Sequence, residues 1–459
     1  MAAPGVPNAT ARTGGGLAAL TPSGRAIVPV GWALYDFANT IFSYAVVSFA
    51  IGLWLTDDAR FGEGSGNLAL SLAILASVGL NAIASPILGA LSDRAGGRRL
   101  PYLLLFTVLC IVPTAIIGAS PPIVGLLLFV VANFAYQSAL IYYDATLRTV
   151  SYPQTRGKLS GIGVAIGYCG TIFVGLLIFL LDLPVASVFL VAAALYGAFA
   201  VPLFLVVREP STPGTPGPTL RDAAAALGQL PATIRSARTV PGLGRFLLGR
   251  FFYSDAVNTI IVVMAIVATR AMGLTQTVAN LILLSLAVVA VLASFGWGAL
   301  VDRLGPKRTL MIVLASWAVG LVLGGISLGV PGTPGLVMFL AAGCILGSGL
   351  GGVQVADRVL MVRLSPPEQL GAFFGLYGLV GKGSQVIGQL LFGATVFLLI
   401  STLGVGAYQV AVLSLLVTML IGAWLVAPVS DRWGGSGELP AATPPPERLA
   451  PATAPIEPR

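Results

Sequence analysis

The sequence predicts an all-α polytopic membrane protein, with about twelve transmembrane helices arranged as two pseudo-symmetric six-helix bundles. Hydrophobic residues make up 56% of the chain, charged residues only 9%, and the mean hydropathy is +0.94. A soluble protein usually carries about 25% charged residues. The long apolar stretches are apolar on every side, which favours helices over the alternating strands of a transmembrane barrel. The internal repeat described below indicates the two bundles.

The apolar stretches are long enough for helices that cross ~30 Å of hydrocarbon. The expected spans are residues 32–56, 68–91, 102–119, 122–147, 158–181, 186–207, 244–270, 277–300, 309–330, 334–362, 371–400 and 404–428. They predict bundles over 31–207 and 244–428, a linker at 208–243, and disordered tails at 1–30 and 429–459. The first thirty residues have no separate apolar core before a cleavage site, so we expect the first helix to insert uncleaved.

The positive charges predict the orientation of the chain. The net charge is +8, and all of the 25 Lys and Arg residues except Arg60, Arg270 and Lys382 lie on the side that holds the amino terminus. Positive loops remain in the cytoplasm. We therefore expect an inner-membrane protein with both termini cytoplasmic. This asymmetry favours a membrane partner over nucleic acid.

Several kinds of chemistry are disfavoured by composition. The chain has no histidine, which removes imidazole metal ligands and Ser-His or Cys-His nucleophiles. Its three cysteines, Cys110, Cys169 and Cys344, lie inside apolar stretches without metal-like spacing. We expect no cofactor, no metal site and no enzymatic activity, and any proton chemistry would use carboxylates.

The strongest motif is a turn that occurs after the second span and again after the eighth. Gly89, Asp93, Arg94, Arg98 and Arg99 in the first copy match Gly298, Asp302, Arg303, Lys307 and Arg308 in the second. Glycines allow helices to approach closely, and a carboxylate at a helix end can meet basic residues or the positive N-terminus of another helix. The pattern predicts a gating latch. The alternative is a basic turn that only fixes topology.

A second repeat concerns glycines. Pro153, Gly157, Gly161 and Gly167 recur with identical spacing as Pro367, Gly371, Gly375 and Gly381. Repeated small residues favour close packing and sliding of helices inside the bundles. We therefore expect these segments to face the interior of the protein and not the lipid.

A third repeat is Asp-x-x-Asn-Thr, in which Asp36 and Asn39 in the first span match Asp255 and Asn258 in the seventh. The spacing places carboxylate and amide on one helical face, and an ionisable residue in lipid usually has a function. We expect the pairs to form one polar site between the bundles, with Asp36 as the coupling residue for a proton. Two alternatives are a structural hydrogen-bonding role and a role restricted to closing the gate.

Lys382 lies within a predicted span, where an unpaired ammonium costs ~3 kcal/mol or more. We expect a carboxylate partner, with Asp36, Asp144 and Asp255 as the candidates. A role as an anchor for a solute carboxylate is the alternative. The candidate site is completed by Tyr35, Gln354, Arg358 and Gln385.

The repeated turn and the two sets of six spans resemble the major facilitator superfamily of secondary transporters. Other segments are similar to its vacuole-effluxer, autophagy-related branch: GWALYDFANT (31–40), YYDATL (142–147), GKLSGIGVAIGYCG (157–170), FYSDAVNTII (252–261), GLGGVQVADRVLMVRLSP (349–366) and FFGLYGLVGKGS (373–384). The resemblance implies alternating access by rocking, a solute bound between the halves, and fungal relatives that export amino acids from the vacuole. Asp357 and Gln389 depart from the residues that the branch leads us to expect.

We therefore expect a secondary active transporter that moves a small polar solute, such as an amino acid, by alternating access. Coupling to protons is expected, and sodium is the other candidate ion. The alternatives are a drug or metabolite exporter of the same fold and, from another class, a membrane-embedded enzyme or a receptor. The protein is expected to be monomeric.

Overall fold

The computed structural model describes residues 16–209 and 230–430, and this part of the chain is helical without any strand. Twelve of its helical segments are long and apolar enough to cross a membrane. The predicted fold class is therefore confirmed. Gln385 lies in the described backbone, but its side chain lies outside the described part of the structure.

The first six spans form one group of helices. Their elements are α1 (Ile27–Ile41), η2 (Phe42–Ala50), α2 (Ile51–Thr56), α3 (Gly62–Arg94), α4 (Leu100–Ile117), α5 (Pro122–Val150), α6 (Arg156–Leu180) and α7 (Val185–Val206). The segments α1, η2 and α2 follow one another without a break and make a single span, in which η2 is π-helical.

The last six spans form the second group. A short helix, α9 (Leu230–Thr239), precedes α10 (Leu243–Ile266), the π-helical η3 (Val267–Ala271), α11 (Gln276–Leu304), α12 (Pro306–Ser327), α13 (Gly332–Leu364), η4 (Pro367–Gln369), α14 (Leu370–Leu403) and α15 (Gly406–Val426). The helices of each repeat therefore occur in the same order in both groups.

Some boundaries differ from those expected. The first span begins at Ile27, five residues before the predicted start. Pro29 is compatible with this start because N–H groups in the first turn of a helix have no partner within the helix, so the missing N–H of proline costs no hydrogen bond. Residues 17–20 of the predicted N-terminal tail form a short 3₁₀ helix, and α9 lies in the predicted linker. Residues 1–15, 210–229 and 431–459, which include most of the predicted tails and linker, lie outside the described residues.

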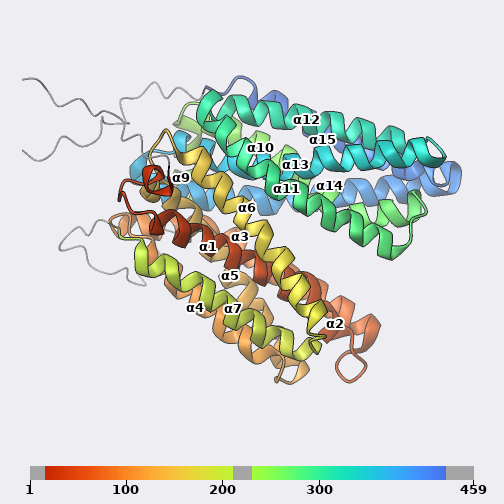
Figure 1. The fold of residues 1–459 in the computed structure, drawn as a ribbon, viewed down its shortest axis with the longest axis horizontal. Helices are drawn as coiled ribbons and strands as arrows, with labels where there is room; N and C mark the ends of the chain where they lie inside the picture. The colour runs from red at the N-terminus through yellow and green to blue at the C-terminus, as the bar shows by residue number, and fades with distance from the viewer. Residues whose placement is uncertain (1–15, 210–229, 431–459) are drawn as a thin grey trace, which may run out of the picture.

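Figure 1 shows the two groups side by side, with α1 to α7 in red to yellow-green and α10 to α15 in green to blue. They approach each other near α9 and diverge towards the opposite end, where α2 and α12 end. We call the end near α9 the linker end. The contacts between the groups are made mainly by α3 with α14 and by α6 with α11.

The repeated glycines make these contacts possible. A Cβ atom on Gly89 would overlap the backbone of Gly371, and one on Gly298 would lie 2.6 Å from the carbonyl oxygen of Gly157. Only glycine fits where two helix backbones approach so closely. Gly157 and Gly371 of the glycine repeat thus lie at the interface between the groups, whereas Gly167 and Gly381 pack against helices of their own group.

Candidate transport site

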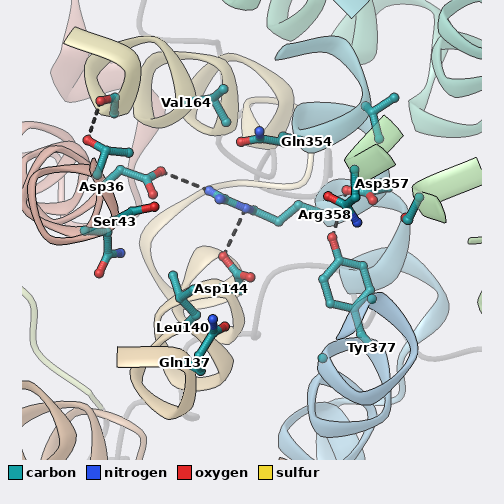
Figure 2. A pocket seen from close by; sticks show the side chains of 18 of the residues that line it. Asp36, Ser43, Gln137, Leu140, Asp144, Val164, Gln354, Asp357, Arg358 and Tyr377 are labelled. Carbon is teal, nitrogen blue, oxygen red and sulfur yellow. Dashed lines mark hydrogen bonds and ion pairs between the residues drawn. The ribbon is translucent and has the colours of Figure 1, made fainter. Parts of the chain in front are cut away.

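A cavity of about 510 Å³ lies between the two groups of helices. Helices α1, α5 and α6 contribute residues from the first group, and α10, α13 and α14 contribute residues from the second. Figure 2 shows the side chains of Asp36, Asp144, Arg358 and Asp357 in this pocket. The cavity lining therefore carries charge on both sides of the interface.

Arg358 joins the two groups. Its guanidinium lies 3.2 Å from Asp36 on α1 and 3.1 Å from Asp144 on α5, and Figure 2 shows it reaching between them. The ring of Trp32 and the ring of Tyr143 lie 5.7 Å and 5.6 Å from it. These aromatic rings attract a cation through their faces. Arg358 is therefore held between two carboxylates of the opposite group.

The repeat explains how Asp144 meets Arg358. Each residue lies nine positions before the repeated proline, Pro153 in one copy and Pro367 in the other. Residues at matching positions converge near the axis that relates two repeats. The two copies have opposite charges there, so the contact across the axis is an ion pair.

Arg250 and Asp357 form a second ion pair, entirely within the second group. Their side chains approach to 3.3 Å, the hydroxyl of Tyr377 donates to Asp357 over 2.8 Å, and Arg250 lies 3.6 Å above the Tyr377 ring. Arg250 also donates to Ser254. Only the unusual carboxylate at Asp357 pointed to this pair in the sequence, because Arg250 was interpreted as one of the positive charges that set the orientation of the chain.

Lys382 makes no ion pair with an expected carboxylate in this conformation, although Asp144, one of the candidates, interacts with it electrostatically from a longer distance. Lys382 donates to the side-chain oxygen of Asn81 on α3, and it has no ion-pair partner among the described residues. Asn81 is fixed by its bond to Ser138, 2.7 Å long. Arg358 forms ion pairs with both cavity carboxylates of the first group, Asp36 and Asp144. The ammonium of Lys382 therefore contacts the neutral amide of Asn81 instead. Asn81 was missed, although a lone amide in an apolar stretch is a usable signal.

The expected single site from the two Asp-x-x-Asn pairs is only partly present. Asp36, Asn39 and Asn258 line the cavity, but Asp255 does not. Its carboxylate accepts from the backbone N–H of Gly388 on α14, at 2.5 Å, and only 1% of the residue is exposed. The side chain of Asp255 therefore faces α14 and is separate from the cavity.

Two further predicted residues have different positions. Gln354 lines the cavity and donates to the hydroxyl of Tyr168 over 2.9 Å, which forms another bond between the groups. Tyr35 is not among the cavity residues, because its ring stacks on Tyr143 and its hydroxyl lies 2.5 Å from that of Thr107. Tyr35 is therefore a buried packing residue of the first group.

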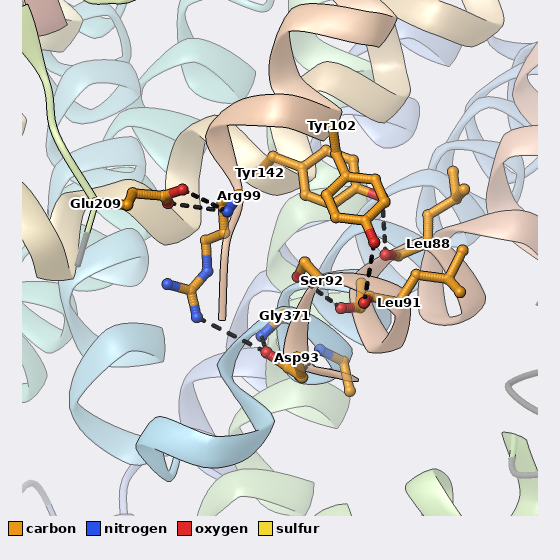
Figure 3. Close-up of polar contacts among 11 residues, drawn as sticks. Leu88, Leu91, Ser92, Asp93, Arg99, Tyr102, Tyr142, Glu209 and Gly371 are labelled. Atoms are coloured by element: carbon orange, nitrogen blue, oxygen red, sulfur yellow. Dashed lines mark hydrogen bonds and ion pairs between the residues drawn. The ribbon is translucent and has the colours of Figure 1, made fainter. Parts of the chain in front are cut away.

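At the linker end, each repeated aspartate binds the start of a helix in the opposite group. Asp93 accepts from the backbone N–H groups of Gly371 and Ala372 on α14, both at 2.8 Å, as the Gly371 contact in Figure 3 shows. Asp302 accepts from Gly157 and Lys158 on α6, at 2.7 Å and 2.9 Å. A helix N-terminus favours a carboxylate. We call these contacts the first and second latch.

The two latches differ in their basic residues. Arg99 lies 3.7 Å from Asp93, and its backbone N–H donates to Glu209, which follows the sixth span (Figure 3). Burial lowers the pKa of Arg99, and Asp93 and Glu209 oppose that effect. In the second copy, the matching Arg308 is exposed. Among the other predicted gate residues, Arg98 and Arg303 are exposed, and Arg94 and Lys307 are half-buried.

Solved structures with the same fold are transporters. The human organic anion transporter MFSD10 (TETRAN) superposes with a TM-score of 0.67 at 16% identity, over 87% of this chain and 98% of that one. A bacterial homologue of the iron transporter ferroportin in an outward-facing state also gives 0.67 at 16% identity, over 88% and 99%. At these identities the likeness shows the fold alone.

Two six-helix groups with a charged cavity between them are the arrangement of the major facilitator fold. The chain belongs to the family described as "Vacuole effluxer Atg22 like", whose profile matches residues 69–432. The predicted family is therefore confirmed. The family and the structural neighbours are transporters, in agreement with the expectation that the chain is not an enzyme.

Curated relatives agree with this assignment. An uncharacterized MFS-type transporter of Bacillus subtilis, YxiO, is 26% identical over 87% of this chain and 94% of its own length. Autophagy-related protein 22 of Coccidioides immitis is also 26% identical, over 56% of this chain. The match spans only 45% of that fungal protein.

Proposed function

We propose that the protein is a secondary active transporter that carries a small zwitterionic solute, such as an amino acid, with coupling to protons. The observation that carries this proposal is the distribution of charge around the cavity. One pole of the lining carries a surplus negative charge and the other a positive charge, and no direct ion pair joins the two in the described structure. A solute with an ammonium and a carboxylate complements both poles.

The charges can be counted from the contacts. Arg250 and Asp357 compensate each other. Arg358 is shared by Asp36 and Asp144, which leaves one surplus negative charge in that cluster. Lys382 is bound to the neutral side chain of Asn81 and leaves one surplus positive charge.

Charges that are removed from water need compensation, which favours a solute that brings the opposite charges. A purely apolar solute would leave both surplus charges uncompensated. The charge distribution therefore favours a polar zwitterion over the lipophilic substrates of a drug exporter. The family description as an effluxer is consistent with export of such a solute.

The same contacts suggest how the solute opens the protein. Arg358 belongs to the second group, whereas Asp36 and Asp144 belong to the first. A solute ammonium that binds these carboxylates competes with Arg358 and weakens a contact that holds the groups together. The solute then shifts the equilibrium between two conformations because it binds them differently. The first and second latches would separate in the other conformation.

The charge asymmetry of the sequence supports a cytoplasmic position for the linker end. In that orientation both termini are cytoplasmic, and the latched conformation is outward-facing in the inner membrane of the cell. We place the protein there as a monomer. Labelling of single cysteines tests this orientation. A cysteine introduced at the linker end should be labelled only from the cytoplasmic side, and one at the opposite end only from the outside.

The experiment is a transport screen with purified protein in liposomes. Radiolabelled amino acids are tested with and without an imposed pH gradient, and uptake is compared with that of empty vesicles. For each transported amino acid, the analogue without its amino group and the analogue without its carboxylate should be transported at least tenfold more slowly. Equal transport of either analogue, or transport of lipophilic drugs alone, would contradict the proposal.

A further inference from the structure

Asp255 is a buried carboxylate outside the cavity. One of its oxygens accepts from the backbone of Gly388, and the other has no hydrogen-bond partner within the described structure. Thr259, one helical turn further along α10, is fully buried, and its hydroxyl also lacks a partner there. Both side chains converge on Gly388, where an added Cβ would lie 2.7 Å from each carboxylate oxygen. Two buried polar groups thus lie beside the same glycine, without a hydrogen bond between them in this conformation.

Among the described residues, the helices packed around Asp255 bring no cation to it. Helix α15 contains no charged residue, and Lys382, the charged residue of α14, lies six positions before Gly388 and donates to Asn81. Arg250, which lies on α10 together with Asp255, is paired with Asp357, and Arg358 on α13 is paired with Asp36.

In the described structure, none of the remaining charged and titratable residues of the contacting elements forms a hydrogen bond or ion pair with the Asp255 carboxylate. They are Arg235 and Arg238 on α9, Arg245 and Tyr253 on α10, Arg270 in η3, Asp302 and Arg303 on α11, Cys344 and Arg363 on α13, Tyr377 on α14, and Tyr408 on α15. An ionised Asp255 would therefore be a buried charge without a counter-ion, which is strongly unfavourable.

We propose that Asp255 is an exchangeable proton site, separate from the solute cavity, and that Thr259 accepts the hydrogen bond of its acid O–H. The proton comes from the aqueous phase and converts the carboxylate into a neutral carboxylic acid, so no other reactant is needed. Neutralisation removes the cost of the buried charge, and Thr259 supplies an acceptor at the same location. The coupling role expected for Asp36 is thereby assigned to Asp255, because Asp36 has an arginine partner.

Helix α14 provides a connection from this site to the rest of the protein. Gly371 and Ala372 at its start bind Asp93, Lys382 binds Asn81, and Gly388 binds Asp255. An ionised carboxylate accepts a stronger hydrogen bond than a neutral acid does. Loss of the proton therefore tightens the contact between α10 and α14, on the same helix that carries the first latch and the Lys382 contact. This coupling step depends on the proposed transport function, whereas the proton site itself does not.

The test of the proton site uses infrared spectroscopy of the full-length protein in lipid nanodiscs, without any solute. The wild-type protein should show a carboxylic-acid C=O band that disappears as the pH is raised. Asp255→Asn should lack this band, and the matched variant of the repeat, Asp36→Asn, should keep it. A band that is unchanged in Asp255→Asn, or lost only in Asp36→Asn, would overturn the assignment.

Two further measurements sharpen the result. Replacing choline by sodium at constant pH should leave the band unchanged, and its loss in sodium would assign the site to that ion instead. If Asp255→Asn does not fold, Thr259→Val supplies the test, because removal of the acceptor should shift the C=O band to higher frequency. A band that does not move in Thr259→Val would then overturn the proposal.

Coupling is tested with an amino acid that passes the transport screen. Asp255→Asn should lose accumulation driven by a pH gradient, with at least tenfold less solute than the wild type, while counterflow exchange persists. Asp36→Asn is the comparison variant. If no amino acid is transported but the Asp255 band is present, the proposed function fails and the proton site stands. If gradient-driven accumulation survives in Asp255→Asn, the coupling role fails.

Discussion

Asp36 and Asp255 occupy the same position of a repeated motif but have opposite surroundings. Asp36 lines the cavity and meets Arg358 of the other group, whereas Asp255 is enclosed against α14 in its own group. The following threonines differ as well, because Thr40 donates to Gly167 on α6 and Thr259 has no partner in the described structure. The repeat has preserved the residues, and the neighbouring helices give them different environments.

The difference follows from the charge on the partner helices. The pseudo-symmetric counterpart of the contact between Asp36 and Arg358 would place Asp255 against Asp144, because Asp144 is the repeat equivalent of Arg358. Two carboxylates in a poorly solvated place repel each other. Asp255 faces α14, and Asp144 shares Arg358 with Asp36. The exchange of a carboxylate at Asp144 for a guanidinium at Arg358, at equivalent positions of the repeat, is thus sufficient to give the two aspartates different surroundings.

The largest effect is expected from Arg358→Ala, which leaves Asp36 and Asp144 buried without a cation. Removing one partner of a buried ion pair costs about 3 to 5 kcal/mol of stability. Addition of Asp36→Asn should restore part of that loss, as measured by thermal unfolding in detergent. The control is Asp255→Asn in the Arg358→Ala background, which should restore nothing. Equal rescue by both second changes would remove the distinction between the two aspartates.

The next effect concerns the positive pole of the cavity. Lys382→Met keeps an apolar side chain of similar length and removes the ammonium, so affinity for a solute with a carboxylate should fall about 10- to 100-fold, or ~1.4 to 3 kcal/mol. The measurement is equilibrium binding of a transported amino acid. Asn81→Ala is the comparison variant, and it should weaken binding less because Lys382 remains. Unchanged binding in Lys382→Met would show that the ammonium does not contact the solute.

A smaller effect separates the two latches. Asp93→Asn and Asp302→Asn should each lower the transport rate and leave equilibrium affinity within a few fold, because they alter access and not binding. The first latch also includes Arg99, so Asp93→Asn should shift the access equilibrium more, by about 1 to 3 kcal/mol. Transport rate and binding are measured on the same preparations. Complete loss of binding in folded Asp93→Asn would contradict a gating role.

The fold and the general location of the site were predictable from the sequence, but the contacts within the site were not. Hydropathy, loop charge and the repeats predict the spans and the glycine contacts because these depend on local composition and spacing. The contact between Lys382 and Asn81 joins residues 301 positions apart. It depends on the rotation of α14 relative to α3, and a single sequence does not encode that rotation in any local pattern. The same reason explains why Asp255 was expected in the cavity.

The smallest effect compares the two threonines that follow the aspartates. Thr40→Val removes a donor to the carbonyls of Gly167 and Phe37, and loss of such a bond costs about 0.5 to 1.5 kcal/mol at any pH. Thr259→Val removes the acceptor for the proposed acid O–H of Asp255, so its cost should appear only at pH values low enough for Asp255 to hold the proton. The sign follows because Thr259 makes no hydrogen bond to the carboxylate in this structure, so the substitution takes an acceptor only from the protonated form. Thermal unfolding across a pH series measures both variants. Thr40→Val should lower stability by the same amount at every pH, and Thr259→Val should lower it only at low pH. A pH-independent loss in Thr259→Val would give its hydroxyl a packing role and leave the proton of Asp255 without an acceptor there.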